Sequence, residues 1–355
     1  MCALSGELVI NLSAIQHNYS SLNAMSHAAC ETAVAVKADC YGLGAAQVVP
    51  ALYQAGARTF FVATIDEGIE VRELLPDVDI FTLNGLWISE SKTYSEYRLM
   101  PVLNSLPEID AYQGAAAVHF DTGMNRLGLT QREANIVCDD PSRFKNIDIR
   151  YIMSHFASAD EHGNPDNQEQ YKRFYDIKKH FKDVKASLSN SGGLFLSRDY
   201  HMDLTRPGIA LYGGNPLDGD VNPMRPVITL HAPVLQIRSL QKGEPVGYSG
   251  TYICESDTRL AVLSIGYADG VLRSLADDSV VHWKGYELPV RGRVSMDSLI
   301  CDLCNVPEKD YPKIGDLVEL MGRNQSLDHF AKQTGTISYE ILTSLGSRYK
   351  RVYTR

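Results

Sequence analysis

The sequence predicts an α/β plus all-β protein, with an N-terminal (β/α)8 barrel of the TIM type followed by a C-terminal domain rich in β-strands. The chain has 355 residues, which is more than one hydrophobic core usually organises. Near-continuous apolar runs alternate with amphipathic segments through its first two thirds, as in a parallel sheet. We expect the barrel at 11–224, the β domain at 225–355, and a strand within 1–10 that joins the C-terminal domain.

The apolar runs of the first part are the expected barrel strands. They are "ETAVAVK", "RTFFVAT", "VDIFTLNG", "RLMPVLN", "AAVHFDTG", "IRYIMSH", "KASLSNS" and "MDLTRPGIALYG". Helical patterns lie between them, namely "GAAQVVPALYQAG", "TQREANIVCDD" and "NQEQYKRFYDIKKHFKDV". Eight such units favour a closed barrel, whereas six would have favoured an open doubly wound sheet.

After about residue 225 the alternation stops and strand-like runs with tight turns replace it. These runs are "PVITLHAPVLQIRSL", "RLAVLSIGYADG", "SVVHWKGYELPVRGRVSMDSLICDL" and "GDLVELMG". The segment "SLDHFAKQTGTISYEILTSL" is expected to be a late helical interruption, with Ser326 as its N-cap.

Composition excludes several classes of function. The formal net charge is -9, and a nucleic-acid-binding surface would instead require basic clusters. No apolar run approaches the roughly 20 residues of a membrane span, and the start "MCALSGELVINLSAIQ" does not resemble a signal peptide. Seven scattered cysteines fit a reducing cytoplasm. Cys301 and Cys304 have CxxC spacing, but no second pair or histidines complete a metal site, so we expect no metal.

Polar residues and glycines gather where the expected barrel strands end. They include Lys37, Asn84, Asp121 to Arg126, His155, Ser191 and Arg206. Barrel enzymes build their active sites from these C-terminal strand ends. The sequence therefore predicts an active site in the barrel mouth.

Lys37 ends the first expected strand, in "AVAVKADCYGLG". Taken alone, it could be a surface lysine, because an unpaired buried ammonium is costly. A tyrosine and two glycines follow within seven residues. This setting favours a desolvated lysine with a lowered pKa, able to form a Schiff base with an aldehyde cofactor.

The segments "SNSGG" and "RPGIALYG" follow the seventh and eighth expected strands. Gly208 in the second lets another backbone approach closely, and the amides around it could cradle a phosphate. Loops after the last two strands of such barrels often bind phosphate. Together with Lys37, they favour a phosphorylated cofactor.

The order and approximate spacing of several motifs resemble those of alanine racemases, which use pyridoxal 5'-phosphate. The motifs are "AVAVKADCYGLGA", "DTGMNRLG", "MSHFASAD", "RPGIALYG", "VGYSGTY", "IGYADG", "GRVSMD" and "TISYE". The resemblance covers nearly the whole chain. It implies interconversion of L- and D-alanine by two bases, a cytoplasmic homodimer with shared active sites, and supply of D-alanine for peptidoglycan.

The resemblance also implies a role for each matching residue. Lys37 would carry the cofactor as a Schiff base and act as one base, and Tyr248 from the partner subunit would be the second base. Arg206 would contact the pyridine nitrogen with support from His155. The remaining roles are phosphate binding by Tyr41, Ser191, Gly208, Ile209 and Tyr339, substrate-carboxylate binding by Arg126 and the amide of Met296, and lining of the entrance by Tyr267, Arg293 and Asp160.

The sequence departs from the family at two positions. Many members carry a carbamylated lysine two positions before "DTGMxRLG", where this chain has His119, and the family's glycine–histidine–glycine is "GLG" here, with Leu43. A neutral imidazole supplies no negative charge, so Arg126 would be positioned by a solute anion or by another network.

The sequence leaves other functions open. A related racemase could act on serine or on a broader range of amino acids. A non-catalytic carrier of pyridoxal phosphate would lack the C-terminal motifs "VGYSGTY" and "GRVSMD". Decarboxylases of this fold place an acidic residue at the ring nitrogen, where this chain has Arg206.

Overall fold

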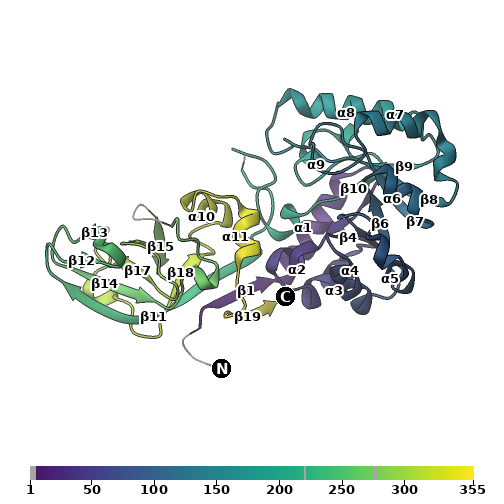
Figure 1. The fold of residues 1–355 in the computed structure, drawn as a ribbon. Helices are drawn as coiled ribbons and strands as arrows, with labels where there is room; N and C mark the ends of the chain where they lie inside the picture. Colours follow the sequence, from purple (N-terminus) through teal and green to yellow (C-terminus); the bar gives the residue numbers. More distant parts are fainter. Residues whose placement is uncertain (1–4, 220, 276–278) are drawn as a thin grey trace. The chain divides into compact units, whose positions relative to one another are not determined.

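The computed structural model describes residues 5–219, 221–275 and 279–355, and these form two compact units (Figure 1). The barrel unit contains Ile15–Leu211 and Asn215–Met224. The β unit contains the described residues up to Ala14, Tyr212–Gly214 and the described residues of Arg225–Arg355.

The barrel unit is built on a parallel nine-stranded sheet whose two edges are halves of one strand. In sheet order the strands are β2 (Glu31–Thr32), β10 (Leu204–Thr205), β9 (Lys185–Ser187), β8 (Ile147–Met153), β7 (Gly114–His119), β6 (Met100–Leu103), β5 (Asp79–Thr82), β4 (Thr59–Val62) and β3 (Val34–Ala35). Only Ala33 separates β2 from β3, and its N–H donates to Thr205 O at 2.9 Å. The sheet therefore closes into a barrel of eight strands, one in each predicted run, which confirms the predicted fold class.

Helices surround the barrel strands, and all of them except α1, which precedes the first barrel strand, come after a strand along the chain (Figure 1). They are α1 (Leu12–Met25), α2 (Lys37–Gly42), α3 (Ala45–Ala55), α4 (Ile65–Leu74), α5 (Ser91–Glu96), α6 (Leu106–Ala111), α7 (Gln131–Asp139), α8 (Pro165–Lys178) and α9 (Gly193–Leu196). Thr64 and Glu67 form a capping box at the start of α4, which explains why the helix begins there. Inside the barrel, Phe61 and Phe81 stack with ring centroids 5.1 Å apart, so the interior is a packed core.

The β unit contains an eight-stranded sheet in which the N-terminal strand lies between β11 and the edge strand β19. The strands are β1 (Glu7–Asn11), β11 (Ile228–Leu240), β14 (Thr258–Leu263), β15 (Val280–Trp283), β16 (Tyr286–Pro289), β17 (Leu299–Asp302), β18 (Leu317–Met321) and β19 (Lys350–Thr354). β1 pairs antiparallel with β11 and parallel with β19. A separate hairpin joins β12 (Pro245–Val246) to β13 (Tyr252–Ile253).

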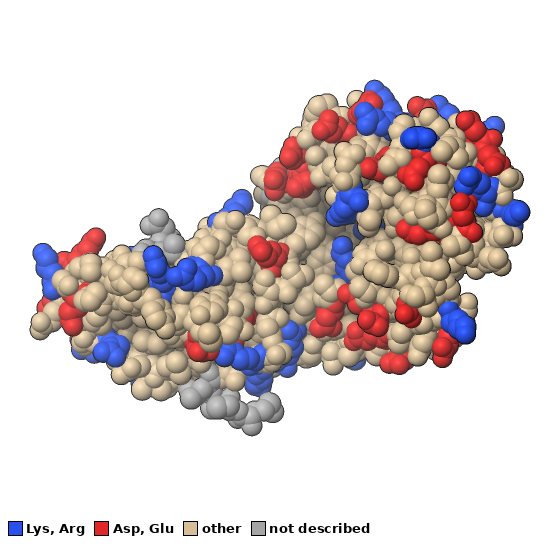
Figure 2. All heavy atoms as spheres, viewed as in Figure 1, with Lys and Arg blue, Asp and Glu red and all other residues tan. Residues whose placement is uncertain are grey.

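The late helical interruption is present as α10 (Leu327–Gln333) and α11 (Ser338–Ser344). Ser326 caps α10, because its Oγ accepts the N–H of His329 at 3.1 Å, as predicted. Within the described residues, none of the helices has the length and apolarity needed to cross a bilayer, and no group of three or more histidine, cysteine or acidic side chains could hold a metal. On the face drawn in Figure 2, basic and acidic side chains are interspersed.

Candidate active site

Lys37 follows β3 after one residue, Val36, and stands at the C-terminal end of the first barrel strand. Its side chain is half-buried. Burial lowers the pKa of Lys37, the positive charge of Arg126 lowers it further, and the carboxylate of Glu67 opposes both. A larger share of this amine is therefore neutral, which is the form that attacks an aldehyde.

The four residues after Lys37 adopt the left-handed conformation, from Ala38 (φ 53°) to Tyr41 (φ 56°). For L-residues this conformation costs about 1–2 kcal/mol each, so the surroundings must hold it in place. Glu67 Oε1 accepts the N–H of Ala38 at 2.8 Å, and Asp39 Oδ1 accepts the N–H of Ala45 at 2.6 Å. The turn brings Tyr41 into the interior, where the residue is 6% exposed.

Tyr41, Ser191 and Gly208 meet beyond the ends of the barrel strands. The hydroxyl oxygen of Ser191 accepts the N–H groups of Gly208 at 2.9 Å and Ala210 at 3.3 Å. A Cβ atom on Gly208 would lie 2.2 Å from the Tyr41 hydroxyl oxygen. Ile209 comes next and is fully buried at the start of a 3-10 turn. Only glycine at position 208 leaves room for this close arrangement of two hydroxyls and backbone amides, whose hydrogen-bond donors suit a phosphate.

We expect Gly208→Ala to destabilise the protein by about 1–3 kcal/mol, because the new methyl group overlaps the Tyr41 hydroxyl. The matched background is Tyr41→Phe, which removes the overlapping oxygen. Urea denaturation of the four proteins of this double-mutant cycle measures the coupling. The expected result is a smaller cost of Gly208→Ala in the Tyr41→Phe background, and an equal cost in both backgrounds would refute the contact.

Arg206 follows β10 and is 5% exposed. Its Nη1 donates to the hydroxyl of Ser187 and its Nη2 donates to Ser154 O at 2.6 Å. Burial lowers the pKa of Arg206 to about 9, so the guanidinium keeps its charge at neutral pH. His155 lies beside it, with Nδ1 3.5 Å from Nη2 of Arg206. Burial and then the charge of Arg206 lower the pKa of His155, so its ring is neutral.

His119, at the end of β7, is paired with Asn104. The amide nitrogen of Asn104 donates to Val102 O at 2.8 Å, so its Oδ1 is the atom that faces Nδ1 of His119, at 2.9 Å. His119 therefore carries its proton on Nδ1 and keeps Nε2 as an acceptor. Burial, followed by the charge of Arg206, lowers the pKa of His119 to about 4. A neutral His119–Asn104 pair thus occupies the position at which the resemblance implies a carbamylated lysine.

We expect His119 to make the protein less stable in acid. The pKa of histidine in an unfolded chain is about 6.5, whereas the pKa of His119 in the folded chain is about 4. Between these two pH values the unfolded chain therefore binds a proton that the folded chain does not. The contribution of neutral His119 to the free energy of unfolding is fully present above this pH range and is lost as the pH falls through it. At pH 5 this one group costs about 2 kcal/mol relative to pH 7.

His119→Gln removes this titration and is expected to reduce the loss of stability between pH 7 and pH 5 by about 2 kcal/mol. Chemical denaturation at both pH values measures it. The exposed His17, changed to Gln, is the matched control and should lose as much stability as the unchanged chain. The same loss in His119→Gln would contradict the assignment.

Arg126 ends a turn that is held by one carboxylate. Asp121 Oδ1 accepts the N–H groups of Gly123, Met124 and Asn125 at 2.9–3.1 Å. The Arg126 side chain is exposed, yet its charge contributes to the lowered pKa values of Lys37, His119 and His155. The loop that carries Arg126 therefore places an exposed cation within electrostatic reach of the lysine.

Asp160, expected at the entrance, lies in the loop after β8 and is exposed. Its backbone carbonyl accepts the N–H of Asp218 at 2.8 Å. This bond fixes the backbone and leaves the carboxylate to solvent.

Tyr248 and Arg293 lie on neighbouring segments of the β unit. Tyr248 stands between β12 and β13 and is 69% exposed. A Cβ on Gly292 would lie 2.8 Å from Val246 O, so the segment that leads into Arg293 packs against this hairpin. Both side chains are exposed, and the phenol of Tyr248 projects from the surface of its own unit.

Tyr267 and Met296 lie on two turns of the β unit that are hydrogen-bonded to each other. The N–H of Tyr267 donates to Ser295 O at 3.0 Å, and the N–H of Ala268 donates to Met296 O at 3.0 Å. Tyr267 is 42% and Met296 is 52% exposed. Tyr339 is on α11 and is also 42% exposed.

Several polar residues that support the barrel mouth were not singled out from the sequence. Asn104 fixes the tautomer of His119, and Ser154 and Ser187 hold the guanidinium of Arg206. Asn104 directly follows β6, Ser154 directly follows β8, and Ser187 ends β9. A complete search of strand ends for hydroxyl and amide side chains would have found Asn104 and Ser187, whereas Ser154 acts through its backbone carbonyl, which no side-chain pattern reveals.

Comparisons with known proteins agree with this arrangement. The family model of the alanine racemase N-terminal domain matches residues 10–216, and that of the alanine racemase C-terminal domain matches residues 227–353. Among curated proteins, the alanine racemase of Rhizobium meliloti is 42% identical over 98% of this chain and 97% of that protein. The catabolic alanine racemase of Rhizobium johnstonii is 44% identical over 98% of this chain and 95% of that protein.

Solved structures of the same architecture superpose over nearly the whole chain. Alanine racemase from Bartonella henselae, with covalently bound pyridoxal phosphate, has a TM-score of 0.93 and 39% identity over 99% of both chains. The biosynthetic alanine racemase from Pseudomonas aeruginosa has a TM-score of 0.92 and 32% identity, over 99% of this chain and all of that one. The chain belongs to the alanine racemase family.

Proposed function

We propose that this protein interconverts L- and D-alanine, using pyridoxal 5'-phosphate attached to Lys37. The observation that carries the proposal is a half-buried lysine with a lowered pKa at a barrel strand end, together with the cradle formed by Tyr41, Ser191 and Gly208. A lysine of this kind forms a Schiff base, and the cradle suits the phosphate of the same cofactor. The covalently bound pyridoxal phosphate of the Bartonella relative supports it.

The residues of the barrel mouth are suited to hold this cofactor. Ser191 Oγ, the Tyr41 hydroxyl and the amides that begin at Gly208 would bind its phosphate, next to the buried Ile209, with Tyr339 as a further phosphate ligand. When bound, the cofactor withdraws electron density from the substrate Cα and so makes its proton removable.

Arg206 would bind the pyridine nitrogen, and His155 would support it from the side. Because the Arg206 guanidinium stays protonated at neutral pH, it would bind this nitrogen without readily transferring a proton to it. We infer that this restrains electron flow into the ring and so favours return of the proton to Cα, which is racemisation, over transamination.

Inversion needs one group to take a proton from one face of Cα and another to return a proton on the opposite face. Lys37 would serve one face once the substrate amine has displaced it. Tyr248 would serve the other face, and its 69% exposure is consistent with delivery to the site of a second subunit. The active unit would then be a homodimer with shared sites.

Arg126 and the backbone amide of Met296 would bind the substrate carboxylate. Tyr267, Arg293 and Asp160 would line the entrance, and all three side chains are exposed. A tyrosine at the entrance restricts side-chain size, which suits alanine.

The test is incubation with L-alanine in deuterated water, with optical rotation and deuterium at Cα followed together, and with L-serine and L-lysine as competing substrates. The expected result is loss of rotation in step with incorporation of deuterium, fastest for alanine. Faster turnover of serine would show that serine, and not alanine, is the preferred substrate. Absence of deuterium exchange at Cα of every amino acid tested would overturn the proposed racemase activity.

A further inference from the structure

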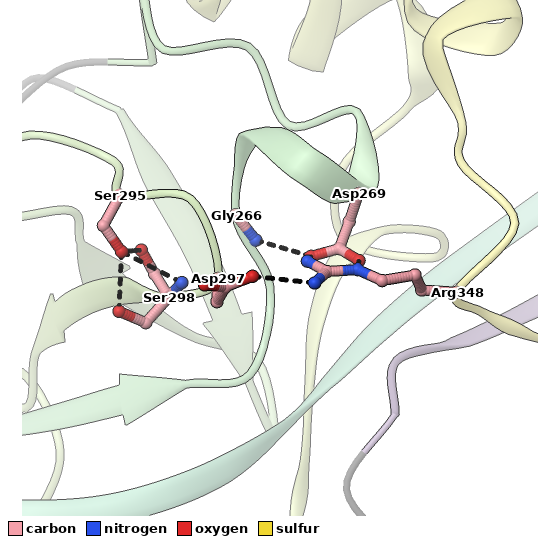
Figure 3. A network of polar contacts seen from close by, with 6 residues as sticks. All are labelled: Gly266, Asp269, Ser295, Asp297, Ser298 and Arg348. Carbon is pink, nitrogen blue, oxygen red and sulfur yellow. Dashed lines mark hydrogen bonds and ion pairs between the residues drawn. The ribbon is translucent and has the colours of Figure 1, made fainter.

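Arg348 in the β unit connects two acidic residues on separate turns (Figure 3). Its Nε and Nη2 donate to Oδ1 and Oδ2 of Asp269 at 2.7 and 2.8 Å, and its Nη1 donates to Oδ1 of Asp297 at 2.7 Å. Two parallel bonds to one carboxylate fix orientation as well as distance. Asp269 is 6% exposed, so this arm is better shielded from water than an ordinary surface ion pair.

Asp269 holds the turn that carries Tyr267. Its Oδ2 accepts the N–H of Gly266 at 2.9 Å and closes the turn (Figure 3). Its backbone carbonyl accepts the Tyr349 hydroxyl at 2.5 Å and the N–H of Gly346 at 3.2 Å. The position of Tyr267 therefore depends on contacts made from the segment around Arg348.

Asp297 directly follows Met296, in a turn closed by Ser295 and Ser298 (Figure 3). Ser298 N–H donates to Ser295 Oγ at 3.0 Å, and Ser295 N–H donates to Ser298 O at 3.0 Å. The second arm of Arg348 thus reaches the turn that carries Met296.

The two turns approach each other as closely as backbones can. A Cβ on Gly266 would lie 2.4 Å from both Ser295 O and Met296 O. Such a contact leaves no freedom for one turn to slide past the other unless their mutual hydrogen bonds break. Arg348 bridges the outer side of this contact, and the segment that holds it follows α11, which carries Tyr339.

We propose that Arg348 is a positioning residue that locks the turn of Tyr267 and the turn of Met296 in register. The inference rests on the proposed function, in which Tyr267 lines the entrance and the Met296 amide binds the substrate carboxylate. Arg348 acts through these two turns. By fixing the distance between them, it sets how closely the Met296 amide approaches the substrate carboxylate and how much room Tyr267 leaves for the substrate side chain.

The first test compares Arg348→Gln and Arg348→Lys with a matched control. Lysine keeps the positive charge but cannot donate two parallel hydrogen bonds to one carboxylate as arginine does. The control is Arg259→Gln, because Arg259 forms an ion pair with Glu308 at 3.5 Å and its side chain is 46% exposed, close to the 48% of Arg348. Hydrogen–deuterium exchange of the Tyr267 and Ala268 amides reports on the register directly, with no substrate present.

We expect Arg348→Gln to speed exchange at these two amides about tenfold, Arg348→Lys to speed it less, and Arg259→Gln to leave it unchanged. Exchange at the wild-type rate in Arg348→Gln would overturn the inference. If Arg348→Gln does not fold, Asp297→Asn removes only the exposed arm, and unchanged exchange there would likewise overturn it.

The second test is kinetic. We expect Arg348→Gln to raise KM for alanine about tenfold, to lower kcat by less than about threefold, and to narrow the preference for alanine over serine. A fall in kcat with unchanged KM and unchanged preference would refute the positioning role. Absence of racemisation by the unchanged protein would instead defeat the proposed function, and exchange would still decide whether Arg348 locks the turns.

Discussion

Lys37→Ala is expected to lower racemisation by about 10⁴-fold or more and to abolish retention of the cofactor during gel filtration. The expected loss of rate is large because the Lys37 amine would have two roles, attachment of the cofactor and proton transfer at Cα. The measurement combines the rate of change of optical rotation with the absorbance of the protein near the edge of the visible range. That absorbance should be lost in the variant.

The control is Lys37→Arg, which keeps a positive charge at the strand end but cannot form a Schiff base at neutral pH. It should be as inactive as Lys37→Ala while its circular dichroism matches that of the unchanged protein. Cofactor absorbance retained in either variant would mean that another amine carries the cofactor.

Tyr248→Phe is expected to stop inversion while sparing cofactor binding, with a loss of about 10²–10⁴-fold in the turnover of L-alanine. Lys37 is unchanged in this variant, so deuterium from the solvent should still enter Cα of the one enantiomer whose Cα proton faces Lys37. Exchange without inversion separates the two bases. Wild-type rates in both directions would end the two-base scheme.

Mixing the two inactive proteins tests whether the sites are shared. A heterodimer of Lys37→Ala and Tyr248→Phe chains has one site with both residues intact, if Tyr248 acts across the subunit boundary. Random exchange of subunits should then restore about a quarter of the wild-type activity. No recovery after subunit exchange would place both bases in one chain.

The fold was predictable because each barrel strand is a near-continuous apolar run, the pattern of a strand buried on both faces. Phe61 and Phe81 show the reason, since they stack inside the barrel. The break at Ala33 was not predictable. This interruption of the first strand lies where the two edges of the sheet meet to close the barrel, and no local sequence pattern indicates that position.

Single candidate residues were predictable from their places at strand ends, as Lys37 and Arg206 were. Their roles came from the family resemblance. The partners of these residues were harder to predict, because Arg348 lies 79 positions from Asp269 and 51 from Asp297. Side-chain pairs so far apart in sequence leave no periodic signal.

The left-handed turn was also absent from the sequence pattern, since only Asp39 of its four residues is of a type that favours positive φ, and alanine, cysteine and tyrosine give no sign of it. It has a consequence for how this enzyme can evolve. At Ala38 and Cys40, where φ is positive, a β-branched side chain would clash with its own backbone. Substitution of either residue by valine, isoleucine or threonine is therefore strongly disfavoured. Libraries for new specificities should therefore leave β-branched residues out of positions 38 and 40 and place their variation in other loops.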